Sequence, residues 1–577
     1  MNATNNNEQR KPHSSRTIFG FLRRTPATPR ILLEHGTIPW LLAVAAATTL
    51  PLAKQLPLWL SLLAGLMLLG RAGLWLKNGR LPRRWILVAI VFAGTVGIAL
   101  QYRALFGRDP GIALLVFFMA LKPMEMSSRR DGLVVVMLGF FLLLTHYFFS
   151  EGVVTGIWLM ASATLLTAAL LRMHGGAQPI RGALGYSALL IAQSLPFMLV
   201  LFLLFPRVQG PLWGMPHDTY AGLSGLSEHM SPGSMGELVL SRAVAFHAKF
   251  AGETPSKAQL YWRGPVFDSY DGRNWRTSWV SNANLTGASN SVNGPVIEAP
   301  EGAGVDYTII LEAHNRRWLL ALDLPIVLPK DATLSPTFEV QSRRPVRFRT
   351  RYAFRSVPEY RVNREEHPRL LQQALSLPRQ LNPRTRELAE SWRQTFGDPE
   401  RVSDAALRFF RTENFFYTLQ PPELGQNVID DFLFDSRRGF CEHYAAAYVV
   451  LMRSAGIPAR VVTGYQGGEF NPVDDSLTVR QSNAHAWAEI WIEGKGWQRV
   501  DPTMAVAPSR IESGIEAVLP ESEALPILMR FNQDWLTALH YRWEALNNAW
   551  DQWVLGYNVE RQRETLIRFG MKEPDWR

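Results

Sequence analysis

DSRRGFCEHYAAAYVVLMRSAGIPARVV, residues 435–462, contains Cys441, the only cysteine among the 577 residues of the chain. The segment that begins at Cys441 has the composition of a helix, and Gly456 followed by Pro458 predicts its end. Gly439 permits a backbone turn immediately before the helix. We therefore expect the thiol at a helix N-terminus, where free N–H groups and the helix dipole favour the thiolate. A buried, inert thiol is the alternative, because free cysteine is among the most buried residue types.

A candidate base lies in AHAWAEIWIEGKGWQRVDPT, residues 484–503, which alternates as two strands joined by a Gly-Lys-Gly turn. A hairpin centred on Lys495 places His485 and Asp501 on the same face, but about 13 Å apart along the strand. Contact between these two side chains therefore requires a bulge, a longer loop or a shifted register after the turn. His443 is a competing base two positions after the thiol, although residues i and i+2 of a helix do not face each other.

Apolar residues are concentrated in residues 36–205, whereas the rest of the chain alternates polar and apolar residues like a water-soluble protein. Several of the apolar blocks approach the roughly 20 residues that a bilayer core requires, so about seven transmembrane helices are predicted. The blocks are 38–53, 57–76, 85–101, 112–121, 132–149, 153–171 and 183–205. The fourth block has only ten residues and indicates either a crossing helix or a tilted or re-entrant piece.

The distribution of positive charge predicts the orientation of these helices. The loops on the N-terminal side carry most of the lysines and arginines, whereas the opposite loops hold Lys54, Arg103 and Arg108. Because positive loops stay in the cytoplasm, the basic segment 1–35 is expected there. Seven crossings then place the linker 206–236 and everything after it outside the cytoplasm, and the loss of one crossing would reverse this.

The soluble part is predicted to contain two domains and a terminal helix. Strand-like runs between Gly-, Ser- and Asn-rich turns predict a β-rich domain at 237–358. Helical patterns followed by alternating strands predict an α+β domain at 363–515, with helices beginning after Asn382 and at Ser403. Tryptophans and leucines at three-to-four spacing predict an amphipathic helix at 525–567, which packs on the domain or lies at the membrane surface.

Three blocks, GFCEHYAAAYVVLMRSAGIPARVVTGYQGG, AHAWAEIWI and GWQRVDPT, resemble the core of the transglutaminase-like superfamily over about residues 405–510. With the multi-pass N-terminus and YWRGPVFD, the whole chain resembles bacterial membrane-bound protein-glutamine gamma-glutamyltransferases. The resemblance implies a papain-like core in which Cys441 is the nucleophile, His485 the base and Asp501 the orienting acid. Such proteins usually continue into a further membrane helix, whereas this sequence ends at KEPDWR, so we expect a truncated chain or one that lacks that anchor.

The reaction implied by the resemblance is attack of the thiolate on a glutamine carboxamide, followed by transfer of the acyl group to a primary amine. Thiol peptidase, amidase or deamidase action on peptides or cell-wall stems uses the same residues and is the alternative. A membrane scaffold with a vestigial triad is a non-enzymatic reading, which the competent residue types at all three positions disfavour. Glu442, Trp487 and Glu489 are expected as structural partners of the site.

The expected partners are protein or peptide substrates that carry glutamine and primary-amine groups. We expect no cofactor and no metal, because Cys441, His443 and His485 lack paired zinc-ligand spacing. No nucleic-acid partner is expected, since no basic run is interleaved with aromatic residues. The predicted location is the bacterial inner membrane, with the catalytic domain on the periplasmic side. The second oxyanion donor and the oligomeric state are not determined by the sequence.

Overall fold

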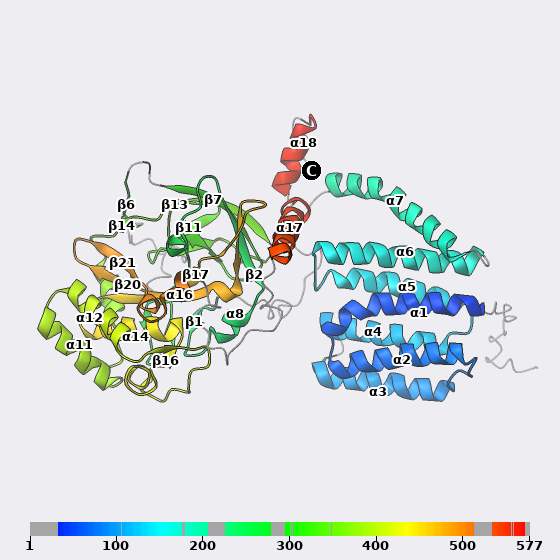
Figure 1. Cartoon of the computed structure of the whole chain (residues 1–577), viewed down its shortest axis with the longest axis horizontal. Coiled ribbons are helices and arrows are strands. Elements are labelled where there is room, and N and C mark those ends of the chain that lie inside the picture. The colour runs from blue at the N-terminus through cyan, green and yellow to red at the C-terminus, as the bar shows by residue number, and fades with distance from the viewer. Residues whose placement is uncertain are drawn as a thin grey trace, which may run out of the picture. The chain divides into compact units, whose positions relative to one another are not determined.

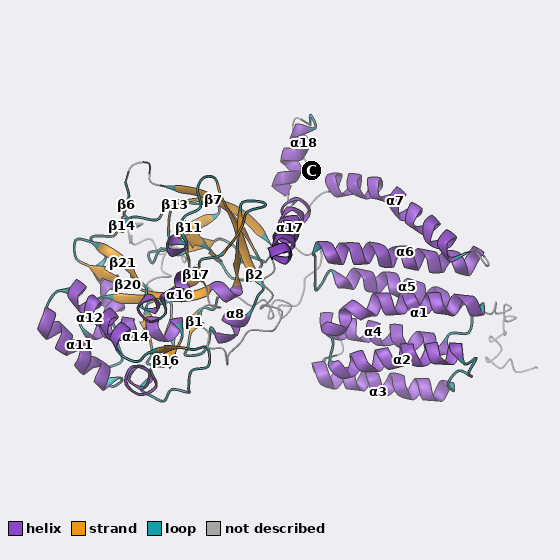
Figure 2. Ribbon diagram, in the orientation of Figure 1, coloured by secondary structure: helices purple, strands orange, loops and turns teal. Residues whose placement is uncertain are grey.

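The computed structural model describes residues 33–104, 107–175, 179–205, 226–278, 295–300, 302, 304–347, 349–512, 534–555, 557 and 559–571. The chain divides into two compact units, Met1–Pro206 and Arg207–Arg577, which are described separately. In the described part of the first unit every element is a helix, whereas the second unit combines helices with β-sheets (Figure 2). Of the predicted basic segment 1–35, residues 1–32 lie outside the described residues.

The helices of the first unit follow the apolar blocks of the sequence. They are α1 (Ile38–Thr49), α2 (Leu58–Leu76), α3 (Arg84–Tyr102), α4 (Arg108–Glu125), α5 (Arg129–His146), α6 (Val153–Gly175) and α7 (Ile180–Leu204). Among the described residues, five segments are long and apolar enough to cross a membrane: His35–Lys54, Leu58–Leu76, Arg84–Tyr102, Val153–His174 and Ile180–Leu204. Helices α4 and α5 are not among these five.

The short fourth block lies within α4, a helix of 18 residues. Helix α4 contacts α1, α2, α3 and α5, and Ile112, Val116 and Phe117 are buried. Arg71 of α2 donates a hydrogen bond from Nε to the Pro123 carbonyl of α4 at 2.9 Å. Because α4 packs among other helices, its polar residues can face protein instead of lipid.

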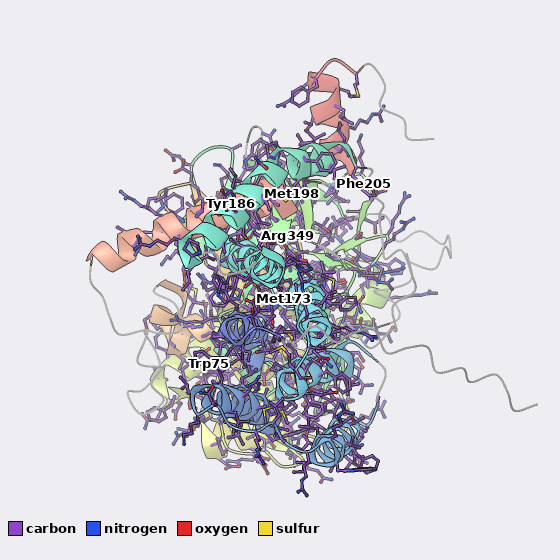
Figure 3. All side chains as sticks on the ribbon, turned by 90° about the vertical axis from the view of Figure 1, so that its right-hand side faces the viewer. Trp75, Met173, Tyr186, Met198, Phe205 and Arg349 are labelled. Carbon is purple, nitrogen blue, oxygen red and sulfur yellow. The ribbon has the colours of Figure 1, made fainter. Side chains whose placement is uncertain are left out.

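Large apolar side chains cover much of the outer surface of this unit. Tyr186, Met198 and Phe205 lie along α7 and its end, and each is more than half exposed (Figure 3). Leu66 and Leu69 of α2 are exposed to a similar extent. A water-soluble protein rarely exposes so much contiguous apolar surface, so the distribution is typical of helices surrounded by lipid.

The second unit is built on two large sheets. One has five strands in the order β21-β20-β17-β3-β9, and the other has six in the order β10-β13-β7-β2-β19-β18. The strands of the five-stranded sheet are β3 (Tyr261–Phe267), β9 (Ala321–Leu322), β17 (Ala459–Gln466), β20 (Ala484–Ile492) and β21 (Gly496–Val500). Those of the six-stranded sheet are β2 (Val244–Phe250), β7 (Val305–Leu311), β10 (Leu324–Val327), β13 (Thr350–Val357), β18 (Glu469–Asn471) and β19 (Ser476–Arg480).

Short strands form smaller sheets around these two. They are β1 (His229–Met230), β4 (Ser269–Tyr270), β5 (Trp275–Arg276), β6 (Ile297–Glu298), β8 (Trp318–Leu319), β11 (Ala332–Leu334), β12 (Val340–Ser342), β14 (Arg361–Val362), β15 (Phe416–Tyr417) and β16 (Arg438–Gly439). The helices are α8 (Gly236–Leu240), α10 (Pro368–Leu375), α11 (Pro383–Phe396), α12 (Pro399–Thr412), α13 (Val428–Asp430), α14 (Cys441–Ser454), α15 (Thr503–Val506), α16 (Pro508–Glu512), α17 (Asp534–Trp550) and α18 (Val559–Arg568). In Figure 1, α11, α12 and α14 gather on one side of β17 and β20, and β2, β7 and β13 gather on the other.

The expected separation of a β-rich domain at 237–358 from a catalytic domain at 363–515 does not hold. Strand β3 pairs with β17, and β2 pairs with β19, so strands from both ranges share both large sheets. An alternating sequence shows that a strand has a buried face, but it does not show which strand lies beside it. The predicted linker 206–236 lies outside the described residues up to 225, and from there on it packs onto this unit through the pairing of β1 with β5.

The helix that begins at the cysteine is confirmed at both ends. Helix α14 spans Cys441–Ser454, and Gly456 adopts a left-handed φ of 81° beyond its last turn. Gly439 is not required for a left-handed turn, because its φ lies outside the left-handed range. A glycine is required there because a Cβ would meet the His443 and Phe432 side chains at 2.8 and 2.9 Å. Close packing therefore excludes a side chain at this position.

Two of the other predicted helix starts show different outcomes. Helix α11 begins at Pro383 as expected, but the Asn382 side chain accepts hydrogen bonds from the backbone N–H groups of Ile429 and Asp430 instead of capping its own helix. The next helix, α12, begins at Pro399 and not at Ser403, because Asp398 caps it by accepting a hydrogen bond from the N–H of Arg401.

The terminal amphipathic segment forms two helices, α17 and α18, joined by a π-helical turn, Asp551–Leu555; residues 525–533 lie outside the described part. The polar side of α17 packs on the edge formed by β18 and β19. Asn548 donates a hydrogen bond to Asp474 at 2.8 Å, and Asn471 donates one to the Tyr541 carbonyl at 2.9 Å. Leu546 on the same helix is half exposed, so packing on the domain is confirmed for its polar side only.

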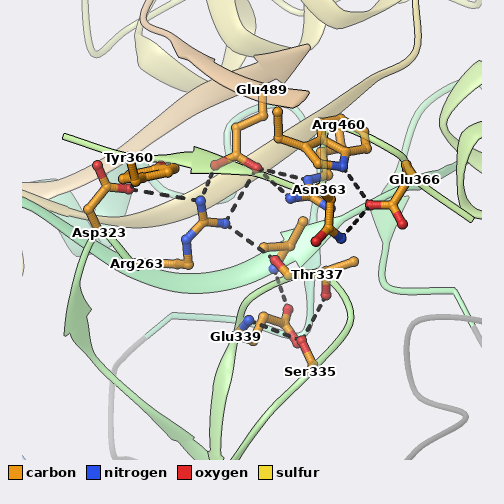
Figure 4. Close-up of polar contacts among 12 residues, drawn as sticks. Arg263, Asp323, Ser335, Thr337, Glu339, Tyr360, Asn363, Glu366, Arg460 and Glu489 are labelled. Carbon is orange, nitrogen blue, oxygen red and sulfur yellow. Dashed lines mark hydrogen bonds and ion pairs between the residues drawn. The ribbon is translucent and has the colours of Figure 1, made fainter. Parts of the chain in front are cut away.

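A buried charge cluster, formed by Arg263, Asp323, Arg460 and Glu489, lies at the five-stranded sheet (Figure 4). Arg499, whose side chain is partly exposed, joins the cluster through Asp323. Glu489 accepts hydrogen bonds from Arg263 and, at 2.8 Å, from Nε of Arg460. Asp323 pairs with Arg499 and lies 4.0 Å from Arg263. Burial alone would raise the pKa of Glu489, but the charges of Arg263 and Arg460 outweigh it and hold that pKa below its usual value.

Candidate active site

The three residues expected to form a triad come from three different elements. Cys441 is the first residue of α14, His485 is the second residue of β20, and Asp501 directly follows β21. The structure brings all three together in the interior, where Cys441 and His485 have no exposed surface and Asp501 is 9% exposed. The triad is therefore shielded from solvent in this structure.

His485 and Asp501 are in direct contact, with 2.7 Å between His485 Nε2 and Asp501 Oδ2. Strand β20 pairs Ile492 with Gly496 and Ala488 with Val500, so the turn is centred one residue before the predicted centre. This shift in register halves the separation along the strand between Asp501 and the position opposite His485. The strand also ends before Asp501. The shifted register is one of the three solutions that the sequence left open.

The backbone after β21 fixes the orientation of the Asp501 carboxylate. The N–H of Thr503 donates a hydrogen bond to Asp501 Oδ1 at 3.0 Å, and the N–H of Met504 donates one to the Asp501 carbonyl at 3.2 Å. This tight turn directs the other oxygen, Oδ2, toward His485. The geometry therefore leaves one carboxylate oxygen for the imidazole and one for the backbone.

Charge and hydrogen bonding favour the ionised forms of this pair. Burial alone would lower the pKa of His485, but the charge and hydrogen bond of Asp501, with a contribution from Cys441, raise it to about 9. Burial would raise the pKa of Asp501, but His485, Tyr261 and the Thr503 N–H hold it below its usual value. An imidazolium next to a carboxylate is thus the stable state of the pair near neutral pH.

The two ring nitrogens of His485 have different surroundings. Nε2 is bound to Asp501, whereas Nδ1 is buried and makes no hydrogen bond of ordinary geometry. Cys441 is near enough to contribute to the raised pKa of the ring. Nδ1 is therefore the nitrogen that is free to exchange a proton with the thiol.

Tyr261 is a further member of the site that the sequence did not identify as functional. Its hydroxyl donates a hydrogen bond to Asp501 Oδ2 at 2.8 Å, beside the His485 contact. The ring of Tyr261 packs edge-on against Trp487 at 5.2 Å, and Trp487 stacks with His485 at 6.3 Å. The motif that begins at Tyr261, YWRGPVFD, is part of the family resemblance, but only the pairing of β3 with β17 places it in the site.

The alternative base, His443, is packed in the core and is not placed to accept the thiol proton. Its ring packs between Phe432 and Phe440, with ring centroids 5.6 and 4.9 Å away. Burial lowers the pKa of His443 to about 4, so the ring is neutral over the physiological range. Among the described residues no hydrogen bond joins it to Cys441, and this histidine is better explained as a packing residue.

Glu442, the residue after the cysteine, binds the segment that precedes α8. Its carboxylate accepts hydrogen bonds from the N–H of Gly233, from the N–H of Met235 at 3.1 Å and from the Ser234 hydroxyl at 3.3 Å. Burial raises the pKa of Glu442 to about 8, although these hydrogen bonds act in the opposite direction. Glu442 thus has a structural role, as expected, and so has Glu489 in the buried charge cluster.

Comparison with known proteins places this geometry in a family. Residues 40–363 match the family described as the TgpA N-terminal domain, and residues 386–502 match the transglutaminase-like superfamily. A protein-glutamine gamma-glutamyltransferase from Pseudomonas aeruginosa is 39% identical over 560 residues, which cover 95% of this chain and 81% of the relative. An uncharacterized protein from Bacillus subtilis is 33% identical over 153 residues, which cover 25% of this chain and 20% of that protein.

A solved structure is also similar. The crystal structure of the periplasmic domain of TgpA from Pseudomonas aeruginosa is 42% identical and covers 51% of this chain and 100% of its own, with a TM-score of 0.48. The same domain bound to ethylmercury is 41% identical, with a TM-score of 0.47 over 50% of this chain and 100% of that one.

Proposed function

This chain belongs to the transglutaminase-like superfamily, in the group with the TgpA N-terminal domain, and we propose that it is a membrane-anchored protein-glutamine gamma-glutamyltransferase. The observation that carries the proposal is the contact between His485 and Asp501 beside Cys441, the first residue of a helix. The name of the Pseudomonas relative supports the substrate class, a protein glutamine. In this proposal Cys441 is the nucleophile, His485 the general base and acid, and Asp501 the residue that orients the imidazole.

The first half of the proposed reaction forms an acyl-enzyme. The thiol proton of Cys441 lies on Nδ1 of the His485 imidazolium, and the sulfur of Cys441 attacks the carboxamide carbon of a glutamine side chain. The carbon–nitrogen bond breaks, and His485 returns its proton to the nitrogen, which leaves as ammonia. The product is a thioester between Cys441 and the glutamyl group.

The second half transfers the acyl group. A primary amine attacks the thioester carbon, and its nitrogen loses a proton to His485. The carbon–sulfur bond breaks, the sulfur leaves as a thiolate and the imidazolium restores the starting pair. Attack by water in place of the amine gives glutamate, so hydrolysis is the competing outcome at the same acyl-enzyme.

The proposed location places the catalytic unit outside the cytoplasm, anchored by the first unit. Five crossings and seven crossings are both odd numbers, so either set places residue 206 on the side opposite the basic N-terminus. An alkaline phosphatase reporter fused after residue 230 is expected to be active, because this enzyme needs disulfides that form outside the cytoplasm. An alkaline phosphatase fusion that is expressed but inactive at this position would contradict the proposal.

The activity is tested with the full chain in detergent micelles, a casein whose lysines are blocked and a fluorescent primary amine. We expect the amine to be incorporated into the casein, and Cys441→Ala to reduce the rate by at least about 10⁴-fold. A melting temperature close to that of the unchanged protein will confirm that the variant is folded.

Two results would count against transfer. Cleavage of peptide bonds, or deamidation without incorporation of the amine, would favour the thiol hydrolase alternative. Incorporation at an unchanged rate in Cys441→Ala would show that Cys441 is not the nucleophile.

A further inference from the structure

The proposed reaction requires donors for the negative charge that develops on the carboxamide oxygen. The backbone N–H of Cys441 is one donor, because the first N–H groups of a helix have no partner within the helix. We propose that the Tyr417 hydroxyl is the second donor and that Arg510 positions it, an inference that rests on the proposed function. Both side chains come from elements outside the triad, β15 and α16.

The backbone places Tyr417 beside the start of α14. Strand β15 pairs in parallel with β16, so that Tyr417 lies opposite Gly439, two residues before Cys441. The N–H of Thr418 donates a hydrogen bond to the Gly439 carbonyl at 2.9 Å. Position 417 is therefore fixed relative to the nucleophile by main-chain bonds on the strand itself.

Packing fixes the ring of Tyr417 as well. The ring lies parallel to that of Tyr444 of α14, at an interplanar angle of 6° and with centroids 6.4 Å apart. The Tyr444 hydroxyl in turn donates a hydrogen bond to the Phe416 carbonyl at 3.0 Å. Because α14 carries both Tyr444 and Cys441, the Tyr417 ring and the nucleophile are held by the same helix.

The Tyr417 hydroxyl is buried and has no hydrogen bond of ordinary geometry. Cys441, through its thiol and its backbone N–H, and the Arg510 guanidinium contribute to its electrostatic environment. Burial, followed by the effect of a charged Cys441, raises the pKa of Tyr417, so the hydroxyl keeps its proton. An unpaired buried hydroxyl is costly, and a substrate oxygen would supply the missing acceptor.

Arg510 is a buried cation without a carboxylate. It has no exposed surface, and within the described part of the chain no Asp or Glu lies within ion-pair distance of it. Nη2 makes long hydrogen bonds, 3.4 and 3.3 Å, to the carbonyls of Ser482 and Ala484, directly before His485. Nε and Nη1 have no hydrogen bond of ordinary geometry. A buried charge of this kind is expensive unless an opposite charge is present for part of the catalytic cycle.

Tyr417 and Arg510 can act together as a single hydrogen-bond donor to the substrate oxygen. A guanidinium N–H of Arg510 turns toward the Tyr417 oxygen and occupies its lone pair, which leaves the Tyr417 O–H to point at the substrate oxygen. No bond to Tyr417 or Arg510 forms or breaks. The positive charge of Arg510 increases the strength of the Tyr417 donor when the oxygen becomes negative, because both lie in a dry interior.

Trp487 is the competing donor, because its indole Nε1 is also buried without a partner. Its ring contacts, however, are with Tyr261 and His485, on the side of the site where Asp501 lies. Tyr417, in contrast, lies opposite Gly439, two residues before Cys441, and its ring packs on Tyr444 of α14. The position of Tyr417 therefore matches the second donor better.

The test compares two reactions of the full chain in detergent: amine transfer to a glutamine peptide, and alkylation of Cys441 by iodoacetamide. Alkylation uses the same thiolate but forms no oxyanion. We expect Tyr417→Phe to lower kcat/KM for transfer by about 100-fold, and to leave the alkylation rate within about threefold of the unchanged protein. Tyr448→Phe is the matched control, because it removes a buried hydroxyl from α14 that contacts Ser403 at 2.5 Å, and it should change neither rate.

Arg510 is tested by how its effect depends on Tyr417. Arg510→Lys should retain more transfer activity than Arg510→Met, since it keeps a cation at the site. In the Tyr417→Phe background, Arg510→Met should lower kcat/KM by less than about threefold more, because Arg510 acts through the hydroxyl. If the Met variant does not fold, the Tyr417→Phe comparison still decides the proposal.

The outcomes separate this inference from the proposed function. If the unchanged protein transfers no amine, the proposed function fails. If it does, the inference is overturned by a Tyr417→Phe variant with full transfer activity. A parallel loss of alkylation and transfer would also overturn it, since Tyr417 would then act on the thiolate. A 100-fold loss in Trp487→Phe but not in Tyr417→Phe would assign the donor to Trp487.

Discussion

Two largely buried polar regions of the second unit differ in how their groups are paired. In the buried charge cluster each carboxylate, Glu489 and Asp323, has an arginine partner. Single nitrogens of Arg263 and Arg460 lack a hydrogen bond of ordinary geometry, but both side chains are paired with Glu489. Around the triad, in contrast, His485 Nδ1, Trp487 Nε1 and two nitrogens of Arg510 have no such bond, and no ion pair to Arg510 is found within the described part of the chain. Paired charges stabilise one arrangement of a core, whereas unpaired ones are kept where a substrate supplies the partner.

The two regions share the same strands. His485, Trp487 and Glu489 alternate along β20 and therefore project from one face of it. Tyr261 and Arg263 stand in the same relation on β3. Position on the sheet therefore does not separate the catalytic residues from the structural ones, whereas the pairing of their charged groups does. Substitutions in the two regions should accordingly affect different measurements.

The largest contrast is expected between two buried aspartates. Asp501→Asn removes the charge that holds the His485 imidazolium, so kcat/KM for amine transfer per folded molecule should fall by about 10³- to 10⁴-fold. Asp323→Asn leaves Arg499 without its counter-charge, so it should lower the melting temperature and leave the rate per folded molecule within about threefold. Similar rates per folded molecule for the two variants would contradict the assignment of a catalytic role to Asp501 and a structural role to Asp323.

The next effect concerns stability alone. Glu489→Gln leaves Arg263 and Arg460 buried without a carboxylate, which should cost about 3–5 kcal/mol in the free energy of unfolding. Chemical denaturation monitored by tryptophan fluorescence measures this cost. Iodoacetamide should alkylate Cys441 in the folded variant at an unchanged rate, and a slower reaction would show that the cluster acts on the thiol.

The pH dependence of amine transfer tests the role of His485 in the triad. His485 has a pKa raised to about 9, and its protonated form delivers the proton to the leaving ammonia, so kcat/KM should fall by about tenfold per pH unit above 9. The raised pKa also stabilises the fold below about pH 6.5, and this contribution is lost as the pH rises through 9. An activity that keeps rising above pH 10 would contradict the role of His485.

The smallest effect is expected for Tyr261→Phe. Asp501 loses one hydrogen bond but retains those from His485 and the Thr503 N–H, so kcat/KM should fall by about tenfold. The acid limb of the pH profile should move to higher pH, because the lost hydrogen bond had lowered the pKa of Asp501. A purely structural tyrosine would change the melting temperature without moving that limb.

Local features of the site could be predicted from the sequence. The helix from Cys441 and its end near Gly456 follow from composition and one glycine. The hairpin that carries His485 and Asp501 follows from alternation, and its simple register correctly indicated that something between residues 494 and 501 had to differ. These features depend on neighbours within about twenty residues, which a sequence pattern records directly.

Long-range features could not be predicted in this way. Tyr261 reaches Asp501 across 240 positions of sequence, through the pairing of β3 with β17. Arg510 and Tyr417 have no sequence signal that links them, because each lies in a short element placed by the fold as a whole. The division into two domains failed for the same reason, since strand alternation does not specify the partner strand.

The central claim, that Cys441 carries the acyl group, is tested most directly by intact-protein mass spectrometry. The full chain is mixed with a glutamine peptide at low pH in the absence of any amine and is then quenched in acid. We predict a covalent adduct with the mass of the peptide less ammonia, located on Cys441, which hydroxylamine releases. An adduct on another residue, or amine transfer without any adduct that hydroxylamine can release, would contradict the account.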